Sequence, residues 1–588
     1  LELNATQASA RKIFTWNPST KALVEVRADT AAQLTAVQAV GGASVTAAVV
    51  DFIRGNDGSG AARPWRLGPL INSAPALVAA PGIWLQGNTA AHGMFESTYK
   101  DRAGLLWVGS NDGLLHAFRI KDGKEQIALL PPSLFAQQVA LYNAYVADAR
   151  NPKGPSGQLA DPARHLYGVA NSFRFGDVWN GATYRTYGVI TLGPGGSGVA
   201  AIDVTDVPVP EPPDPPDPAY VYPASPVTVV WTHNPTTLAG LGQSWSIPAM
   251  APVADGRSWR LLMGSGYDPA GTAALQTSNL AGYPKPKAFT IDPTDGSLLN
   301  AEELSTTNTQ TPFVGNQAFA DTVLLNPDSR FYQDDNISRL GLQADLNGRI
   351  HFLTSNNASQ AKFDTSIVGI DASAKVGQSQ PIYYNPAASG YGKGTNAGCV
   401  AYAFGSGTLY ERSAAVTGAS STFVPTLYVA TAQKVNWDDA LGVGQISPKV
   451  VAGTWTVEND DGTTGTATLG GRSQLTGPPF MLVPRSGVGQ SKALFLLYDP
   501  EAGCYGRSYV AQIAFEGSET CTPTNTDYKA FDAGEGAASG FTIAGTKVLV
   551  SKSGIGQGQK ASLFEPPGVA ASVGGIPEPK VKWWKELK

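Results

Sequence analysis

The chain has 588 residues, with 66 Gly and 42 Pro, 9% aromatic residues and only 15% charged residues, against about 25% charged in an average domain. Its net charge of -5 lacks the excess of basic residues that is typical of nucleic-acid-binding proteins. No apolar run approaches the roughly 18 residues that a membrane helix needs. Gly and Pro are spread along the whole chain, which indicates many turns and not one disordered tail. We therefore expect a secreted, all-β protein that binds no nucleic acid and does not insert into a membrane.

Helical patterns are few. The Ala-rich segment from Asp29 to Val50 predicts one helix. The segment from Pro132 to Ala149 has apolar residues at helical spacing and predicts another.

A short unit recurs along the chain, consisting of an apolar strand, a tight turn and a second apolar strand. Its clearest copy is LLWVGSNDGLLHAF at 105–118, where Asp-Gly supplies the positive φ that a tight hairpin needs. Related segments follow at 198–204, 261–268, 287–299, 339–353, 426–432 and 493–503. Repeated four-stranded units are typical of a propeller, so we predict an all-β propeller of roughly seven blades, with loop insertions and few short helices.

Three parts follow from this pattern. Residues 1–50 are expected to form an N-terminal segment that packs on the propeller, and residues 51–565 the propeller itself. Residues 566–588 are expected to form a C-terminal tail whose aromatic strand, Lys580 to Lys588, pairs back to close the ring and remove a free edge.

The segment GPGGSG, from Gly193 to Gly198, matches the dinucleotide-binding pattern G-x-G-x-x-G literally. That motif requires a strand before it and a helix after it. Here the apolar runs on both sides are strands, so the pattern predicts a hairpin turn.

The segment from Val207 to Pro226 contains nine prolines and predicts an exposed polyproline-like loop between two strands of one blade. A stiff spacer is the favoured interpretation. The alternative is a loop that docks a partner, and its candidate residues are Pro208, Pro210, Pro212, Pro213, Pro215, Pro216 and Pro218.

The three cysteines are too few for a disulfide scaffold, and their spacing fits no zinc site. Cys504 and Cys521 flank one predicted hairpin, and a bridge between them would contribute about 3 kcal/mol in an oxidising compartment. We expect that bridge, with Cys399 free. Three unrelated thiols are the alternative.

No catalytic pattern is evident. The five histidines, at 92, 116, 165, 233 and 351, are isolated in sequence, and neither H-E-x-x-H nor G-x-S-x-G occurs. His116 and His351 each lie in a predicted strand after a Gly turn, which predicts packed or rim residues. We predict no catalytic residues and no enzymatic activity.

Two acidic clusters are possible calcium ligands. Asp334, Asp335 and Asn336 form one, and residues 458–462 form the other. Neither meets the D-x-[DN]-x-[DN]-G pattern of a calcium loop, and a solvated turn is favoured for both.

Several motifs, in order along the chain, resemble the PilY/PilC proteins at the tips of bacterial type IV pili. They are DFIRG at 51–55, WRLGPLINSAP at 65–75, LWVGSNDGLLHAFRIKDGKEQIALLP at 106–131, GGSGVAAIDVT at 195–205, GQSWSIP at 242–248, LMGSGY at 262–267 and the final VKWWKEL. The block at 106–131 is the most specific of them. The resemblance covers nearly the whole chain and is to the C-terminal propeller domain of that family.

This resemblance implies a non-enzymatic protein that supports pilus assembly, surface adhesion and twitching motility. It would pass through the periplasm to the pilus tip at the cell surface. The implied partners are minor pilins, with a host or abiotic surface or another tip protein.

The sequence departs from the family at its calcium loop. Only Asp334, Asp335 and Asn336 remain of the acidic run, Ala344-Asp345 stands where Gly-Asp is typical, and Arg339 would oppose a divalent cation. Calcium is therefore a possible cofactor for which we expect weak or absent binding.

A quinoprotein-like propeller oxidoreductase is the alternative function. The Gly-x-x-Asp-Gly-x-x-x-Ala-Phe sequence followed by an acidic Gly turn also resembles the blades of that class. The absence of an adjacent Cys pair and the irregular repeats count against it.

Overall fold

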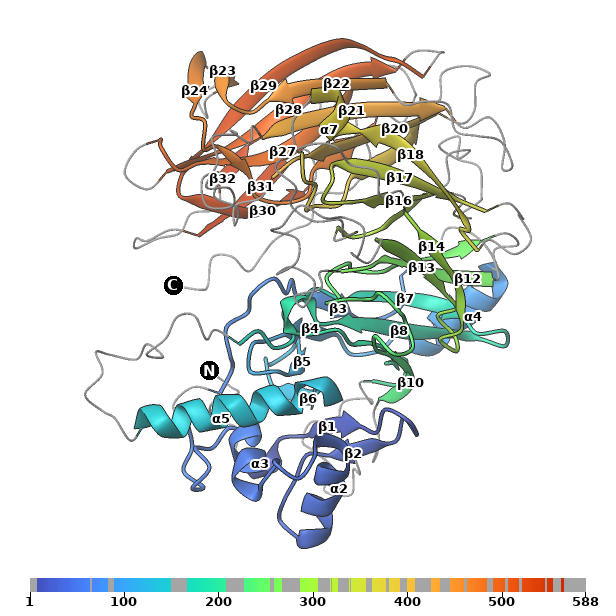
Figure 1. Ribbon diagram of the computed structural model, residues 1–588, viewed down its shortest axis with the longest axis vertical. Coiled ribbons are helices and arrows are strands. Elements are labelled where there is room, and N and C mark those ends of the chain that lie inside the picture. The colour runs from blue at the N-terminus through green and yellow to red at the C-terminus, as the bar shows by residue number, and fades with distance from the viewer. Residues whose placement is uncertain are drawn as a thin grey trace, which may run out of the picture. The chain divides into compact units, whose positions relative to one another are not determined.

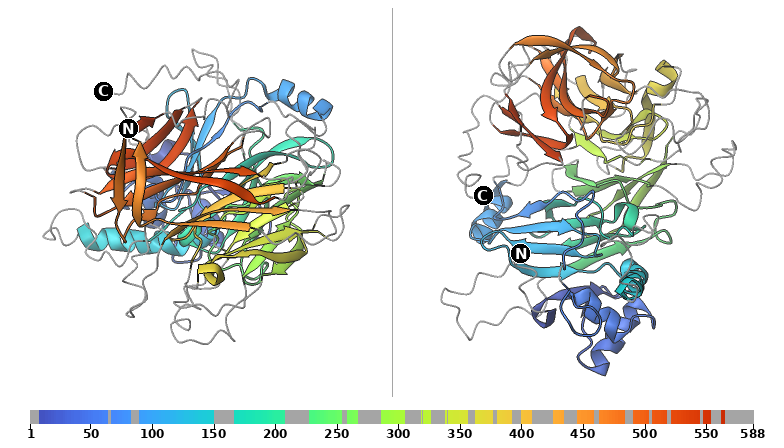
Figure 2. Two further views of the ribbon diagram at one scale, coloured as in Figure 1. Left: turned by 90° about the horizontal axis from the view of Figure 1, so that it is seen from above. Right: turned by 90° about the vertical axis from the view of Figure 1, so that its left-hand side faces the viewer.

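The computed structural model describes residues 8–564, apart from 64–65, 83–88, 150–165, 208–226, 254–257, 267–285, 305–317, 319, 326–337, 339, 356–361, 377–379, 392–398, 408–424, 434–444, 459–462, 484–489, 503–505, 518–520, 545–546 and 554–561. These residues form two compact units, 1–301 and 302–588, and each is described by itself (Figures 1 and 2). None of the described helices has the length and apolar character needed to cross a lipid bilayer.

The first sheet of unit 1 joins the start of the chain to strands far along it. Its order is β2 (Leu23–Glu25), β1 (Ile13–Trp16), β6 (Glu125–Leu129), β5 (Leu115–Arg119), β4 (Leu105–Gly109) and β3 (Ala76–Val78). β1 runs parallel to β6, while the other neighbours are antiparallel. The hairpin predicted at 105–118 is therefore confirmed as β4–β5.

The expected single helix at 29–50 is wrong, because two helices occupy this region. α2 (Ala31–Gly41) begins at a Thr30 capping box and ends at Gly42, whose φ is 86°. α3 (Ala47–Arg54) begins at Thr46, whose side chain accepts from the Val49 N–H. The Gly pair stops the first helix and Thr46 caps the second, and both are local signals that the Ala-rich composition obscured.

Further helices lie before and after β4–β6. The predicted helix at 132–149 is confirmed as the short η2 (Pro132–Leu134) followed by α5 (Phe135–Ala149). α4 (Thr89–Tyr99) was not expected from the sequence, and a short 3-10 turn, η1 (Ala8–Ala10), precedes β1.

Two four-stranded antiparallel meanders complete unit 1. The first contains β7 (Arg174–Trp179), β8 (Tyr184–Thr191), β9 (Val199–Asp203) and β10 (Thr228–His233), and the second β11 (Ala249–Val253), β12 (Ser258–Gly264), β13 (Lys287–Ile291) and β14 (Leu298–Glu303). The short helical turn η4 (Gly193–Gly195) joins the antiparallel strands β8 and β9, which confirms the hairpin interpretation of GPGGSG.

The position of the Pro-rich segment within one blade is also confirmed. β9 pairs with β10 from Asp203 opposite Thr228 to Val199 opposite His233. The strands before and after the segment are thus neighbours in one sheet. The segment itself lies outside the described residues.

Unit 2 continues with two more four-stranded meanders. They contain β15 (Val323–Leu325), β16 (Leu340–Ala344), β17 (Arg349–Thr354) and β18 (Thr365–Asp371), then β19 (Ala387–Tyr391), β20 (Cys399–Gly405), β21 (Thr426–Gln433) and β22 (Gln445–Val450). The short helix α7 (Ala372–Val376) follows β18.

A seven-stranded sheet and a three-stranded sheet end the described chain. The larger has the order β24 (Thr464–Leu469), β23 (Gly453–Glu458), β29 (Pro523–Glu535), β28 (Arg507–Gly517), β27 (Ser491–Asp499) and β25 (Gln474–Leu475), with β26 (Phe480–Leu482) also on β27. The smaller contains β30 (Ala537–Ala544), β31 (Lys547–Ser553) and β32 (Ser562–Phe564).

These sheets confirm the predicted fold class, a mostly β protein of repeated propeller-type four-stranded units with few helices. The described residues form seven sheets, four of which have four strands. The number of roughly seven blades stays a prediction. The three-part division at 1–50, 51–565 and 566–588 stays a prediction. The tail proposed to close the ring lies outside the described residues.

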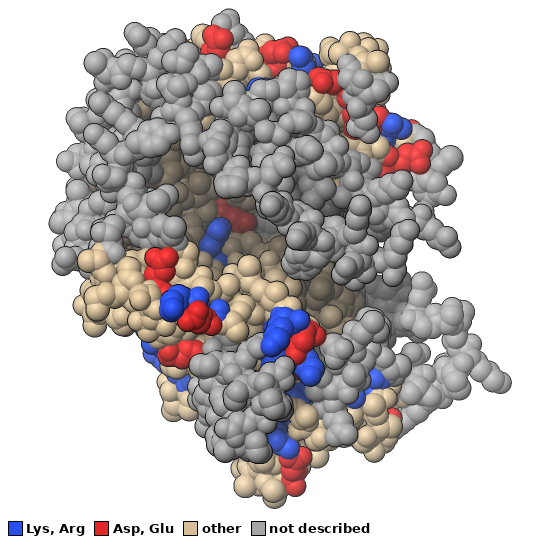
Figure 3. Space-filling view, turned by 180° about the vertical axis from the view of Figure 1, so that it is seen from behind, with Lys and Arg blue, Asp and Glu red and all other residues tan. Residues whose placement is uncertain are grey.

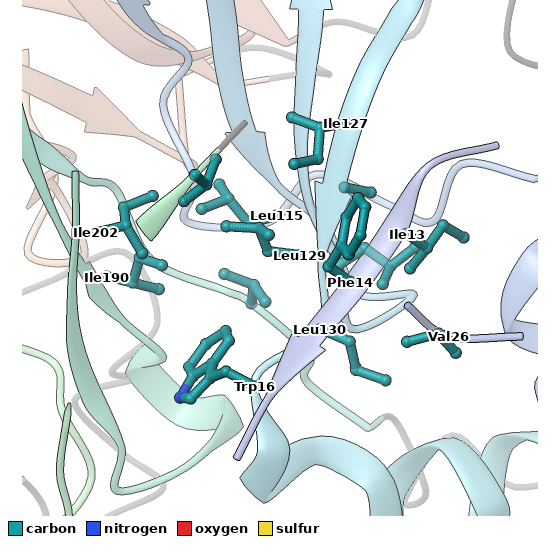
Figure 4. Packing of buried hydrophobic residues seen from close by; sticks show 14 of the residues in the cluster. Ile13, Phe14, Trp16, Val26, Leu115, Ile127, Leu129, Leu130, Ile190 and Ile202 are labelled. Atoms are coloured by element: carbon teal, nitrogen blue, oxygen red, sulfur yellow. The ribbon is translucent and has the colours of Figure 1, made fainter. Parts of the chain in front are cut away.

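Both units have apolar cores in which strands pack through alternate residues. In unit 1, one cluster joins Phe14 of β1, Leu115 of β5, Leu129 of β6 and Ile202 of β9 (Figure 4). On the face shown in Figure 3, the acidic and basic side chains of the described residues are interspersed.

Candidate functional site

A group of buried charged residues lies at the first sheet of unit 1. His116 on β5 contacts two carboxylates, with Nδ1 2.7 Å from Glu125 Oε1 and Nε2 3.1 Å from Asp112 Oδ2. An ionised carboxylate only accepts hydrogen bonds, so both ring nitrogens must donate. His116 is therefore an imidazolium.

Arg11 completes this group from the start of the chain. Its Nε lies 2.6 Å from Glu125 Oε2, and its Nη2 lies 2.8 Å from Glu125 Oε1, which is a bidentate pair. The side chains of Arg11 and His116 are fully buried, and that of Glu125 is 2% exposed. Two cations and two anions thus cancel within the group, which we call the buried quartet: Arg11, Asp112, His116 and Glu125.

The quartet shifts the pKa values of its members. Burial alone lowers the pKa of His116, but the attraction of Asp112 and Glu125 outweighs it and raises that pKa to about 9. Burial raises the pKa of Glu125, but Arg11 and His116 bring it down to about 2. For Asp112, burial is likewise outweighed, chiefly by His116, and its pKa is lowered. All four groups are charged at neutral pH.

Local sequence positions the Asp112 carboxylate. Asp112 Oδ1 accepts from the Leu114 N–H at 3.0 Å, and Gly113 has φ 89°, a conformation that favours glycine. This turn directs the carboxylate to His116, four residues on. The Asp-Gly-x-x-His part of the most specific family-like block therefore builds one corner of the quartet.

A second buried cation ties the first fifty residues together. The Arg54 guanidinium, at the end of α3, donates to the carbonyl oxygens of Ala8 (2.7 Å), Arg11 (2.8 Å), Val26 (2.9 Å) and Ser9 (3.1 Å). Burial, followed by the charge of Arg27, lowers its pKa to about 10. These hydrogen bonds connect α3 to η1 and to the residues beside β1 and β2. Arg54 is part of the family-like segment at 51–55.

Unit 2 repeats the Asp–His pairing in a simpler form. His351 Nε2 lies 2.8 Å from Asp345 Oδ2, and both side chains are fully buried. Asp345 Oδ1 accepts from the N–H groups of Asn347 and Arg349, each at 2.9 Å. The prediction that His116 and His351 are packed residues is confirmed.

The sequence prediction for the disulfide is wrong. Cys521 is bonded to Cys399, 122 residues away, with 5.5 Å between the two Cα atoms. Cys399 begins β20 and Cys521 lies just before β29, so the bond joins two sheets of unit 2. Cys504 lies outside the described residues. Nearness in sequence misled the prediction, because a disulfide requires nearness of the Cα atoms in space.

The remaining predicted site residues stay untested. Asp334, Asp335, Asn336 and the candidate prolines between Pro208 and Pro218 all lie outside the described residues. Within the described part of the chain, no group of three or more His, Cys, Asp or Glu side chains is arranged to hold a metal ion.

One apolar cavity of about 100 Å³ lies between β1 and the β8–β10 strands of unit 1. Trp16 and the prolines at 18, 131 and 132 line one part of it, and Ile190, Val199 and His233 another. Figure 4 shows Trp16 and Ile190 in this region. His233 is already paired, with Nε2 2.8 Å from the Gly296 carbonyl oxygen and Nδ1 3.0 Å from Thr237 Oγ1.

In the quartet, each charged side chain contacts an oppositely charged neighbour, and these contacts join the start of the chain to the first sheet. Sequence reasoning singled out His116 but missed Arg11 and Arg54, which act through partners far along the chain. Glu125 lies in the family-like block at 106–131, but nothing in that block indicates that its partner is Arg11.

No protein-family model matches the chain. A type IV pilus biogenesis factor PilY1 from Pseudomonas aeruginosa (strain UCBPP-PA14) is 29% identical over 226 residues, 37% of this chain and 17% of that protein. A PilY1 homolog from Xylella fastidiosa is 27% identical over 252 residues, 40% of this chain and 18% of that protein. The matched part thus spans less than a fifth of either relative.

Among solved structures, the Pseudomonas aeruginosa PilY1 C-terminal domain matches with a TM-score of 0.47 and 18% identity, covering 81% of this chain and 98% of that one. The Saccharomyces cerevisiae protein Sqt1 matches with a TM-score of 0.30 and 10% identity, covering 76% and 90%. The sequence relatives confirm the resemblance carried by the motifs over 37–40% of the chain, which is distantly similar there to type IV pilus biogenesis factors of the PilY1 family.

Proposed function

We propose that the chain is the propeller part of a non-enzymatic pilus-tip protein that supports type IV pilus assembly, surface adhesion and twitching motility. The observation that carries the proposal is the role of the family-like motifs. The segments at 51–55 and 106–131 supply Arg54, Asp112, His116 and Glu125, which fasten strands together. These motifs maintain a scaffold, and a scaffold suits a protein that presents variable loops to partners.

The proposed location is the periplasm during assembly and then the pilus tip at the cell surface. The buried Cys399–Cys521 disulfide supports an oxidising compartment, and the homology supports association with the pilus machinery. The proposed partners are minor pilins, together with a host or abiotic surface or another tip protein.

Deletion and complementation in the encoding bacterium test this function. Loss of the gene should reduce pilin in the sheared surface fraction and shrink the twitching zone, and the wild-type gene should restore both. Full piliation, adhesion and twitching in the deletion strain would contradict the proposal.

The Pro-rich segment can be tested in the same strain. Replacing residues 208–226 by a short Gly/Ser turn should preserve piliation if the segment is a spacer. If it docks a partner, piliation or adhesion should fall while the purified protein keeps its melting temperature.

Two further measurements address cofactors. Purified protein mixed with quinone and calcium should show no new visible absorption, whereas a bound-quinone spectrum would favour the oxidoreductase alternative. A thermal-shift gain in calcium that disappears in Asp335→Ala would contradict the proposed weak or absent calcium binding at residues 334–336.

A further inference from the structure

The β23–β24 hairpin of unit 2 has two contrasting faces. Its strands form six antiparallel pairs without a shift in register, from Gly453 opposite Leu469 to Glu458 opposite Thr464. Trp455, Val457 and Leu469 are buried in the apolar core of the unit. The other face carries the exposed threonines Thr454 and Thr456 on β23 and Thr464, Thr466 and Thr468 on β24, together with the half-buried Glu458 opposite Thr464.

Among the described strands, β24 is also an edge strand. It stands at the end of the seven-stranded sheet and, among the described strands, pairs with β23 alone (Figure 1). Proteins usually protect such edges with charged residues, proline or a bulge. The sequence of β24, TGTATL, has no charge and no proline, and its pairing with β23 is regular. This edge is therefore a template for one more strand.

The pattern of β24 identifies the strand that fits. Thr464, Thr466 and Thr468 are symmetric about Thr466, so antiparallel pairing of β24 with itself repeats the same residues on both sides. We propose that β24 pairs with β24 of a second copy of this chain, about a two-fold axis that passes beside Thr466.

The register of this pairing follows from its symmetry. Thr466 faces Thr466 of the second copy, and Thr464 faces Thr468 in both directions. The existing pair Thr456–Thr466 then extends into a row of four threonines that crosses both hairpins, while the pair Thr454–Thr468 extends to Thr464 and Glu458 of the second copy. Cross-strand threonine pairs stabilise a sheet.

The opposite face also accepts this register. Gly465 of one copy faces Ala467 of the other, so two small residues meet and no large side chain must move. No charged residue of β24 opposes a like charge, because the strand has none. The interface is isologous, as expected for a two-fold dimer. A single strand pair buries less than the ~1,000 Å² of a stable interface, so the association should be weak and concentration-dependent.

Cysteine cross-linking of the purified full chain tests the pairing, with Cys504→Ser in every variant to remove the third cysteine. Thr466→Cys should form a covalent dimer under mild oxidation, because facing residues have Cα atoms about 4.5–5.5 Å apart, within disulfide range. Thr456→Cys is the matched control. It is an exposed threonine of the same face, but its symmetry mate lies three strand spacings away, at about 14 Å.

The register has its own test. Thr464→Cys and Thr468→Cys should each remain monomeric alone, because identical positions lie four residues apart along the paired strands, about 13 Å. An equimolar mixture of the two variants should cross-link. This result distinguishes the proposed register from a random encounter of exposed thiols.

A charge variant supplies a readout without thiols. Thr466→Lys places two ammonium groups opposite each other across the axis and should abolish the concentration-dependent dimer in sedimentation velocity, whereas Thr456→Lys should retain it. Melting temperatures establish that each variant is folded.

A folded Thr466→Cys protein that does not cross-link, or equal cross-linking of all four cysteine variants, would overturn the proposal. A monomer in both assays would leave the edge to a strand from a different protein and would also reject self-pairing. These assays use purified protein, so their outcome is independent of the pilus function proposed above.

Discussion

The buried quartet makes the stability of unit 1 depend on pH through His116. The folded-state pKa of about 9 lies above the ordinary value of 6.5, so the folded protein retains a proton that the unfolded chain loses. The stabilisation is fully present below pH 6.5 and is lost as pH rises through 9. Between these values the free energy of unfolding should fall by about 1.4 kcal/mol per pH unit, about 3 kcal/mol in total.

The perturbation that tests this is His116→Gln. Glutamine does not titrate, so the variant should lack this slope. At pH 6.5 it should be less stable than the wild type by about 3–5 kcal/mol, because two buried carboxylates lose their shared cation. The difference between the proteins should shrink by about 3 kcal/mol by pH 9 and above, because the wild type has then lost the same charge.

The assay is equilibrium unfolding in urea at a series of pH values. Pulsed hydrogen exchange of β4–β6 peptides, performed under one fixed labelling condition, assigns the transition to unit 1. His233→Gln is the matched control, because its imidazole is held by Gly296 and Thr237 and its pKa is lowered, mainly by burial. It should keep the wild-type slope above pH 7. Equal slopes in the wild type and His116→Gln would show that His116 does not cause this pH dependence.

Three further outcomes are expected. Arg54→Lys should lower the free energy of unfolding by about 3 kcal/mol, because an ammonium group has only three donors and cannot replace the planar guanidinium that binds four carbonyl oxygens. Arg27→Lys is the control: its ion pair with Asp29 is exposed, so the urea midpoint should change little. Peptide mapping of non-reduced protein should find Cys399 linked to Cys521 and one reactive thiol, and opening this long loop should cost up to about 5 kcal/mol. A linkage from Cys521 to the third cysteine instead would contradict the structure. Replacing residues 208–226 by a Gly/Ser turn should move the melting temperature by only a few degrees, about 1 kcal/mol, and unfolding of the protein would place that segment in the core.

Elements whose causes are local could be predicted from the order of the amino acids. Apolar runs on both sides of an Asp-Gly turn predict β4–β5, because this turn demands the positive φ that Gly113 adopts. The same reasoning assigns GPGGSG to a hairpin and 132–149 to a helix. Composition was a poorer guide than capping at 29–50, where Gly42 and Thr46 divide one Ala-rich stretch into two helices.

Contacts between distant residues, by contrast, depend on how the whole unit packs. Arg11 and Glu125 are 114 residues apart, and they pair because β1 lies parallel to β6 in the first sheet. Cys521 bonds to Cys399 and not to the nearer Cys504. Short-range patterns fix the conformation of a segment, but the partner of a buried charge or thiol is set by the order of strands in the sheets. That strand order depends on the packing of the whole unit, so it cannot be predicted from the sequence of any single segment.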